Sequence, residues 1–308
     1  MVETFIEKFQ VPDEALPVLD SIFRCEEMEL VENLPNLSFN LEDAALALQN
    51  ASGRIWKTAE VNDFLHTTYN RGIINLNDDT YTSFHINNFY TRLDVFVVSE
   101  PEIYLAFPQP IRKKIDRWYF NAYLENLDDT DRPSADRVLT LEQTFELIDS
   151  EKRTPWLSYC DCRILAGNCK KPTHTCISFF SGLNSMAHRG WSQPVTKDEL
   201  KKVVRKANRK GLMQTAHTNG ICNCCGDCCY LFRAQQVRSR GLVWPATDHI
   251  AAYDAESCID CGACVRRCHF NAFTADGDSI QFHEELCRGC GLCAEICPAD
   301  AIEMQVRS

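Results

Sequence analysis

Near its C-terminus the chain reads CIDCGACVRRC over residues 258–268 and CRGCGLCAEIC over residues 287–297. Both stretches place four cysteines in the pattern C-x2-C-x2-C-x3-C. A zinc site usually uses two separated C-x2-C pairs, whereas each stretch here packs three cysteines into seven residues and adds a fourth close behind. This spacing wraps a short loop around an iron–sulfur cluster. It predicts two [4Fe-4S] clusters held by eight cysteines: Cys258, Cys261, Cys264, Cys268, Cys287, Cys290, Cys293 and Cys297.

The segment around these cysteines resembles a bacterial-type two-cluster ferredoxin domain. The resemblance covers residues 253–303 and rests on two full copies of the pattern, followed by FNAF after the first and PADAI after the second. In this family the fourth cysteine of each copy binds the other cluster. The resemblance therefore implies cluster one on Cys258, Cys261, Cys264 and Cys297, and cluster two on Cys287, Cys290, Cys293 and Cys268.

One position departs from the family pattern, because His269 stands where a proline usually follows the fourth cysteine. The change removes no ligand, but it frees a backbone N–H and places an imidazole beside a cluster. Two interpretations stay open. The imidazole tunes the reduction potential through hydrogen bonding or proton coupling, or it is a surface histidine tolerated at a turn.

The length of 308 residues is enough for two or three domains. No apolar run of eighteen residues occurs and the mean hydropathy is negative, so we expect no direct membrane insertion. Glu3, Glu7 and Lys8 interrupt the first residues, so no secretory signal is expected. We therefore predict a cytoplasmic, reducing location, in which disulfides are rare.

Charge is distributed in three blocks. Residues 1–150 carry 12 Lys and Arg against 27 Asp and Glu, residues 151–245 carry 16 against 5, and residues 246–308 carry 4 against 11. Residues 128–137 are polar and turn-prone, as in a linker. We predict an α+β protein with three domains: an acidic winged-helix-like domain (1–127), a basic cysteine-rich domain (138–245) and a ferredoxin-like domain (246–308). The charged faces are expected to select redox partner proteins.

The first domain is expected to be helix-rich with one hairpin. A capped helix is predicted from Asn40, a second over residues 58–71, and a hairpin from residues 73–76 and 81–86. This order is that of a winged helix, a fold associated with DNA binding. The net charge of residues 1–150 would repel phosphates, and the second helix offers only Arg71 at its end. We therefore predict no nucleic-acid partner, and a protein-contact or scaffold role.

A further helix is predicted in the basic domain. Thr196 and Glu199 make a capping box, and Gly211 is the expected C-terminal stop. The apolar stripe of this helix consists of Leu200, Val203, Val204 and Ala207. Its Lys and Arg residues would form either an ordinary solvated face or a docking surface for an acidic redox partner.

Nine further cysteines crowd the basic domain. Close thiolates repel one another unless protons or a metal neutralise them, and nearby Lys and Arg favour the ionised, metal-binding form. We predict one or two further [4Fe-4S] clusters, with a structural zinc ion as the alternative. The ligands would come from Cys160, Cys162, Cys169, Cys176, Cys222, Cys224, Cys225, Cys228 and Cys229. Cys25, which lies outside both groups, is expected to be a small buried apolar residue.

Residues 155–303 resemble a family of iron–sulfur proteins of anaerobes, in which a C-x-C-R segment, an N-C-C-G cluster and a two-cluster ferredoxin follow one another. The resemblance implies electron transfer without an established substrate. Residues 224–226 are also similar to the CCG motif of heterodisulfide-reductase-type catalytic subunits, although the spacing of the surrounding cysteines departs from that motif.

The chain contains no G-x-G-x-x-G, G-x4-G-K-[ST] or G-x-S-x-G motif, so no nucleotide or hydrolase site is indicated. We predict a cytoplasmic, oxygen-sensitive iron–sulfur electron-transfer protein, acting as a subunit or accessory electron donor of a larger anaerobic oxidoreductase. Two alternatives stay open. One is a reductase with a catalytic cluster at Cys222–Cys229, and the other is an iron–sulfur redox sensor that uses the winged-helix-like domain on DNA.

Overall fold

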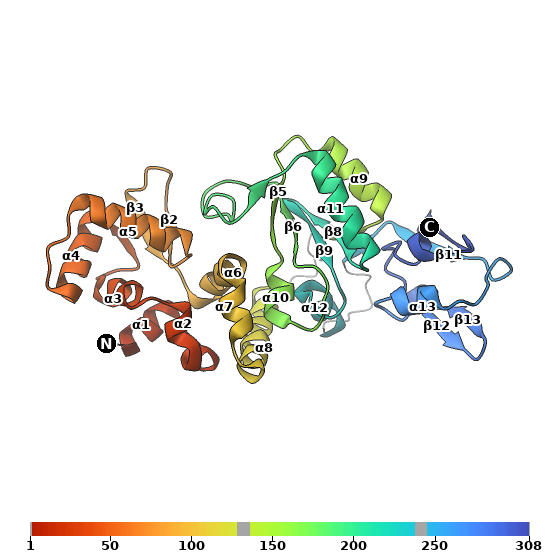
Figure 1. The fold of residues 1–308 in the computed structure, drawn as a ribbon, viewed down its shortest axis with the longest axis horizontal. Helices are drawn as coiled ribbons and strands as arrows, with labels where there is room; N and C mark the ends of the chain where they lie inside the picture. Colours follow the sequence, from red (N-terminus) through yellow and green to blue (C-terminus); the bar gives the residue numbers. More distant parts are fainter. Residues whose placement is uncertain (1, 128–135, 238–244, 308) are drawn as a thin grey trace. The chain divides into compact units, whose positions relative to one another are not determined.

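The computed structural model of the chain describes residues 2–127, 136–237 and 245–307 (Figure 1). Its mixture of helices and strands confirms the α+β class. The chain forms two compact units. Unit 1 comprises Met1–Asn126, Ile164–Ala166 and Ser181–Gln193, and unit 2 comprises Leu127–Arg163, Gly167–Phe180 and Pro194–Ser308. Most of the predicted linker, residues 128–135, lies outside the described residues.

Unit 1 is built mainly from short helices. They are α1 (Val2–Phe9), the 3-10 helix η1 (Asp13–Val18), α2 (Leu19–Ile22), α3 (Cys25–Asn33), α4 (Leu41–Ser52), α5 (Thr58–Asn70), α6 (Phe89–Ser99), α7 (Pro101–Ala106) and α8 (Gln109–Asn126). Strands β1 (Ser38–Asn40), β2 (Ile74–Leu76) and β3 (Ser83–Ile86) pair antiparallel in the order β1-β3-β2. The predicted helices and hairpin are confirmed as α4, α5, β2 and β3.

Arg71 lies just beyond α5 and is buried. Its guanidinium pairs with Glu27 at 2.5 Å and with Glu100 at 2.6 Å. Arg92, which is fully buried, also contacts Glu100 at 3.1 Å. The exposed residues of α5 itself include no Lys or Arg. The one cation that the sequence offered for phosphate contact is therefore part of the core of unit 1.

The expectation for Cys25 is wrong. This residue begins α3 and is exposed, and its thiol donates to the Glu29 carboxylate at 3.5 Å. The hydrogen bond and the negative charge of Glu29 raise the pKa of the thiol. Position 25 faces outward because the buried side chains of this helix are Glu27, Leu30 and Val31.

The segment Ser181–Gln193 comes from the middle of the chain but packs within unit 1. The Asn184 side chain accepts from the N–H of Leu76 at 2.9 Å and donates to its carbonyl at 3.0 Å. The Tyr69 hydroxyl lies 2.7 Å from Nδ1 of His188. This segment thus completes the edge of strand β2 with side-chain hydrogen bonds.

Unit 2 contains a sheet of order β10-β4-β8-β9-β6-β5-β7. Its strands are β4 (Arg137–Leu139), β5 (Trp156–Tyr159), β6 (His174–Ser178), β7 (Gln193–Pro194), β8 (Met213–His217), β9 (Gly220–Cys224) and β10 (Ala246–Thr247). Helices α9 (Leu141–Ser150) and α11 (Lys197–Arg209) pack against the sheet (Figure 1). Leu157, Ile177 and Ile221 of the sheet meet Ile148 and Leu200 of these helices in one core.

The predicted helix of the basic domain is confirmed as α11. Thr196 accepts from the Glu199 N–H at 3.2 Å, and the Glu199 carboxylate accepts from the Thr196 N–H at 2.8 Å. Gly211 has a φ of +81°, the left-handed conformation expected past a helix end. Two shorter helices, α10 (Asp161–Ala166) and α12 (Tyr230–Val237), belong to the cysteine-rich segments.

The C-terminal part of unit 2 has two small antiparallel sheets. Strand β11 (His249–Tyr253) pairs with β14 (Ile302–Val306), and β12 (Phe273–Asp276) pairs with β13 (Ser279–Phe282). Helix α13 (Ala263–Arg267) and the 3-10 helices η2 (Glu284–Leu286) and η3 (Ala294–Ile296) connect them. Within the described ranges, no helix is both long and apolar enough to cross a membrane.

Candidate cluster and metal sites

The two C-x2-C-x2-C-x3-C copies share one backbone pattern. The residue before the second cysteine has a positive φ in both copies, at Asp260 and Gly289, and so does the residue after it, at Gly262 and Gly291. These turns bend each loop so that its first three cysteines face one side. The sequence repeat is therefore also a structural repeat.

The first site lies in a cavity lined by Cys258, Cys261, Cys264 and Cys297, together with Tyr253. Three of these cysteines come from the first copy and the fourth from the second. The N–H of Asp260 donates to the Cys258 sulfur at 3.3 Å. Such N–H to sulfur bonds favour thiolates and raise the reduction potential of a cluster. Cys261 is exposed, so this site reaches the surface of the protein.

The second site gathers Cys287, Cys290 and Cys293 with Cys268. Burial raises the pKa of Cys290 to about 12, and the neighbouring charges of Cys268 and Cys287 act in the same direction. Burial also raises the pKa of Cys293, and Cys290, Cys287 and Cys268 add to that shift. Cys268 thus lies among the cysteines of the other copy. These two sets of four thiols fit [4Fe-4S] clusters, which require four cysteine ligands each.

The nine middle cysteines separate into two groups because neighbouring residues point in opposite directions at the end of a strand. Cys222 and Cys224 lie on β9 two residues apart, whereas Cys225 follows the strand and points away from Cys224. Cys228 and Cys229 divide in the same way: Cys228 joins Cys225, and Cys229 joins Cys224.

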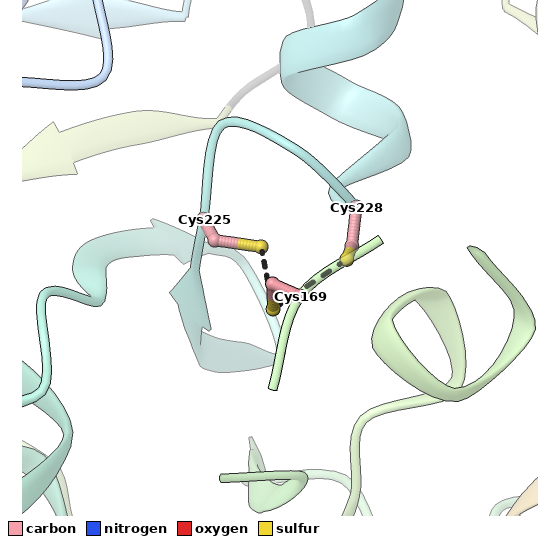
Figure 2. A group of neighbouring side chains, drawn as sticks. All are labelled: Cys169, Cys225 and Cys228. Carbon is pink, nitrogen blue, oxygen red and sulfur yellow. Dashed lines mark hydrogen bonds between the residues drawn. The ribbon is translucent and has the colours of Figure 1, made fainter. Parts of the chain in front are cut away.

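The first group, called here the three-thiol site, consists of Cys169, Cys225 and Cys228 (Figure 2). The Cys169 sulfur lies 3.8 Å from that of Cys225 and 3.7 Å from that of Cys228. All three sulfurs lie within 4.8 Å of one another, and Cys225 and Cys228 are buried. Hydrogen bonds from Cys169 and Cys228 lower the pKa of Cys225, so Cys225 is the favoured thiolate of the three.

The second group, called here the six-thiol group, consists of Cys160, Cys162, Cys176, Cys222, Cys224 and Cys229. Cys224 and Cys229 lie 3.5 Å apart at their sulfurs. Hydrogen bonds from Cys222 and Cys229 lower the pKa of Cys224. Contacts with Cys176 and Cys224 raise the pKa of Cys222, and contact with Cys160 raises that of Cys162.

Arg163, the arginine of the CDCR segment, is buried beside both groups. Its guanidinium donates to the carbonyl of Pro172 at 2.6 Å, to the Thr175 hydroxyl at 3.1 Å and to the carbonyl of Asn223. Burial alone lowers its pKa, but the charges of Cys160 and Cys225 outweigh burial and raise it. Arg163 therefore stays cationic and offsets the negative charge of the thiolates.

His269 is half-buried, so it is not a surface histidine. Its Nε2 lies 2.8 Å from the Gly211 carbonyl oxygen, and its Nδ1 accepts from the Gly226 N–H at 3.4 Å. Burial lowers its pKa and favours the neutral imidazole. The residue after Cys268 is therefore held against the loop that carries the three-thiol site.

Sequence reasoning assigned no role to Lys171. Its ammonium group donates to the Gly211 carbonyl at 2.9 Å and lies 3.2 Å from Nε2 of His269. Burial lowers its pKa, and the Cys225 and Cys169 thiolates counter that effect. The sequence feature that could have indicated a role for Lys171 is its position two residues after Cys169.

The loops, the two four-cysteine sets and the small sheets all lie in the C-terminal segment of the chain. Residues 251–304 match the sequence family described as 4Fe-4S dicluster domain, so this segment is a ferredoxin domain of that family. Pyruvate synthase subunit PorD of Thermotoga maritima is 45% identical over 51 residues, 16% of this chain and 52% of that protein. PorD of Methanothermobacter marburgensis is 40% identical over 55 residues, 17% of this chain and 60% of that protein.

Indolepyruvate oxidoreductase subunit IorA of Thermococcus kodakarensis is 32% identical over 77 residues, 24% of this chain and 11% of that protein. The chain thus spans between about a tenth and three fifths of the length of these relatives. No solved structure matches. The similarity supports iron–sulfur electron transport for the C-terminal domain.

Proposed function

We propose that this protein is an iron–sulfur electron carrier, acting as a subunit or accessory electron donor of a larger anaerobic oxidoreductase in the cytoplasm. The observation that carries the proposal is the pair of four-cysteine sets in a 4Fe-4S dicluster domain. When bound, the clusters accept and release single electrons. The chain supplies the thiolates, the N–H donors to sulfur and the apolar surroundings that set their potentials.

Electrons would enter or leave at the first ferredoxin site, because Cys261 is exposed there. Ile259 is 63% exposed in the same loop, and Asp254, Glu256 and Asp260 are exposed nearby. An apolar patch with an acidic rim suits a partner that presents a basic rim around its own redox centre.

The second ferredoxin site would pass electrons to the six-thiol group. Cys290 and Leu292 pack in one apolar cluster with Cys222, Cys224 and Cys229. Because this apolar contact joins cysteines of the two groups, it supports one further [4Fe-4S] cluster in the six-thiol group. That cluster would be the last centre of an electron path that begins at the first ferredoxin site. The names of the relatives describe subunits of pyruvate synthase and of indolepyruvate oxidoreductase. An oxidoreductase of several subunits is accordingly the proposed partner.

For unit 1 we propose a winged-helix-like scaffold or protein-contact domain. The order α4, α5, β2 and β3 supports the fold assignment, and the burial of Arg71 supports the absence of a DNA partner. The redox-sensor alternative would require cations on the exposed face of α5. The reductase alternative would require an iron with an exchangeable ligand in the six-thiol group.

Anaerobic purification of the full chain tests the proposal. We expect about eight irons from the ferredoxin domain and about four from the six-thiol group, all reducible at low potential. Affinity capture under the same conditions should recover an oxidoreductase of several subunits. A chain that contains iron but exchanges no electrons with the captured complex would contradict the electron-carrier role.

A further inference from the structure

The sulfur spacing of the three-thiol site fits a single tetrahedral metal ion. With Zn–S bonds of about 2.3 Å and tetrahedral angles, two thiolates on one zinc ion lie about 3.8 Å apart. The observed distances from the Cys169 sulfur are 3.8 Å to Cys225 and 3.7 Å to Cys228. Without an ion, the same contacts serve as S–H hydrogen bonds between the thiols.

The ferredoxin sites of the same chain provide an internal comparison. Each thiolate of a cubane binds its own iron, so the sulfurs around a cubane are farther apart than sulfurs on one ion. Among the described residues, Cys169, Cys225 and Cys228 are the one group of three potential ligands whose ligating atoms all lie within 4.8 Å. The cysteines that line the first ferredoxin cavity are therefore more widely spaced.

The local sequence and hydrogen bonding also fit a zinc site. Cys225 and Cys228 form a C-x2-C pair, the spacing with which two residues of one turn bind a zinc ion. The backbone N–H of Cys228 hydrogen-bonds the Cys225 sulfur, and that of Lys171 hydrogen-bonds the Cys169 sulfur. These bonds stabilise thiolates, which are the metal-binding form.

Three thiolates leave one position of a tetrahedral ion open. No described His, Asp or Glu joins the three sulfurs within 4.8 Å. Three thiolates and a divalent cation carry one net negative charge, and Lys171 and Arg163 lie close by to offset it. Structural zinc sites are closed by four protein ligands, whereas an open position admits water or an exchangeable ligand.

We propose that Cys169, Cys225 and Cys228 bind one zinc ion whose fourth position takes an exogenous ligand. This inference rests on the proposed metal-binding role of the basic domain but assigns its nine cysteines to two different centres. The three-thiol site holds a redox-inactive ion, and the six-thiol group serves the electron path.

Two adjacent cysteines give matched variants of the full chain. Cys225→Ser should reduce zinc from about one per chain to less than about a tenth and leave iron unchanged, because it removes one of three zinc ligands. Cys224→Ser should lower iron and leave zinc unchanged. Cys25→Ser, at an exposed position in unit 1, is the control that should change neither. Loss of iron with unchanged zinc in Cys225→Ser would overturn the proposal.

Zinc-edge X-ray absorption of the unmodified full chain provides a readout that does not depend on the variants folding. It should show three sulfurs at about 2.3 Å and one nitrogen or oxygen neighbour, and added 2-mercaptoethanol should raise the sulfur number to four. Four sulfurs before addition would contradict the open position, and absence of bound zinc would contradict the site. Either result could occur with the ferredoxin domain still holding about eight irons, so failure here is distinct from failure of the electron-carrier role.

Discussion

Replacing Arg71 with methionine should destabilise unit 1. The side chain of Arg71 is 8% exposed and that of Glu27 is 1% exposed, and their ion pair measures 2.5 Å. Removing one partner of a buried ion pair costs about 3–5 kcal/mol, because the other charge is left without a partner. Methionine has a similar length and no charge, so the effect reports on the ion pair more than on packing.

The lower end of that range applies here. Arg71 repels the fully buried Arg92, whose pKa is lowered to about 10 by burial and by the charge of Arg71. Removing Arg71 relieves this repulsion. The Ile22 carbonyl, which accepts from Arg71 at 3.1 Å, keeps its bond from Arg92 at 2.7 Å. We therefore expect the free energy of unfolding of unit 1 to fall by about 3 kcal/mol, which corresponds to roughly a hundredfold faster exchange of its backbone amide hydrogens.

Hydrogen–deuterium exchange of the full chain, followed by mass spectrometry of peptides from α3 and α5, measures this loss locally. Arg54→Met is the matched control, because the Arg54–Glu60 pair is 3.6 Å long and its side chains are 54% and 43% exposed. Solvent screens an exposed pair of this kind, so it contributes little to stability. Adding Glu27→Gln to Arg71→Met should recover part of the loss. Equal exchange in the Arg71 and Arg54 variants would refute the reasoning.

Three further predictions concern function. In the anaerobically purified full chain, Cys268→Ser should alter the paramagnetic spectrum of the cluster bound by Cys287, Cys290 and Cys293, because the fourth ligand is exchanged between copies. A spectral change confined to the other cluster would contradict the crossed ligand assignment. The full chain should show no saturable binding to mixed-sequence DNA duplexes at physiological salt, measured by fluorescence anisotropy, since the exposed face of α5 has no cation. A dissociation constant of about 10⁻⁶ M, roughly the strength of non-specific binding, would restore the sensor hypothesis. His269→Ala should leave the iron content unchanged and shift the reduction potentials of the clusters little, because the ring nitrogens of His269 contact the backbone of Gly211 and Gly226. The potentials of the variant are measured by redox titration. A large shift would mean that His269 tunes a cluster directly.

The sequence by itself determined the ferredoxin domain. Each copy places its first three cysteines within seven residues, so a short loop with two left-handed turns is enough to bring them together. The helices α4 and α11 were also predictable, because Asn40, Thr196 and Glu199 form caps with residues only a few positions away. Such features depend only on residues that lie close together in the sequence, so they can be predicted without the rest of the fold.

Only the tertiary structure decided how the nine middle cysteines divide. Cys169 and Cys225 are 56 residues apart in sequence, and neither motif indicated that they meet. Their contact depends on the fold of unit 2 around β9, where successive residues point to opposite sides. Arg71 is a similar case, because its position after a helix suggested a surface cation. In the structure, Glu27 of α3 and Glu100, which lies between α6 and α7, form ion pairs with it in the core. Long-range pairing of this kind leaves no periodic or local signal in a single sequence.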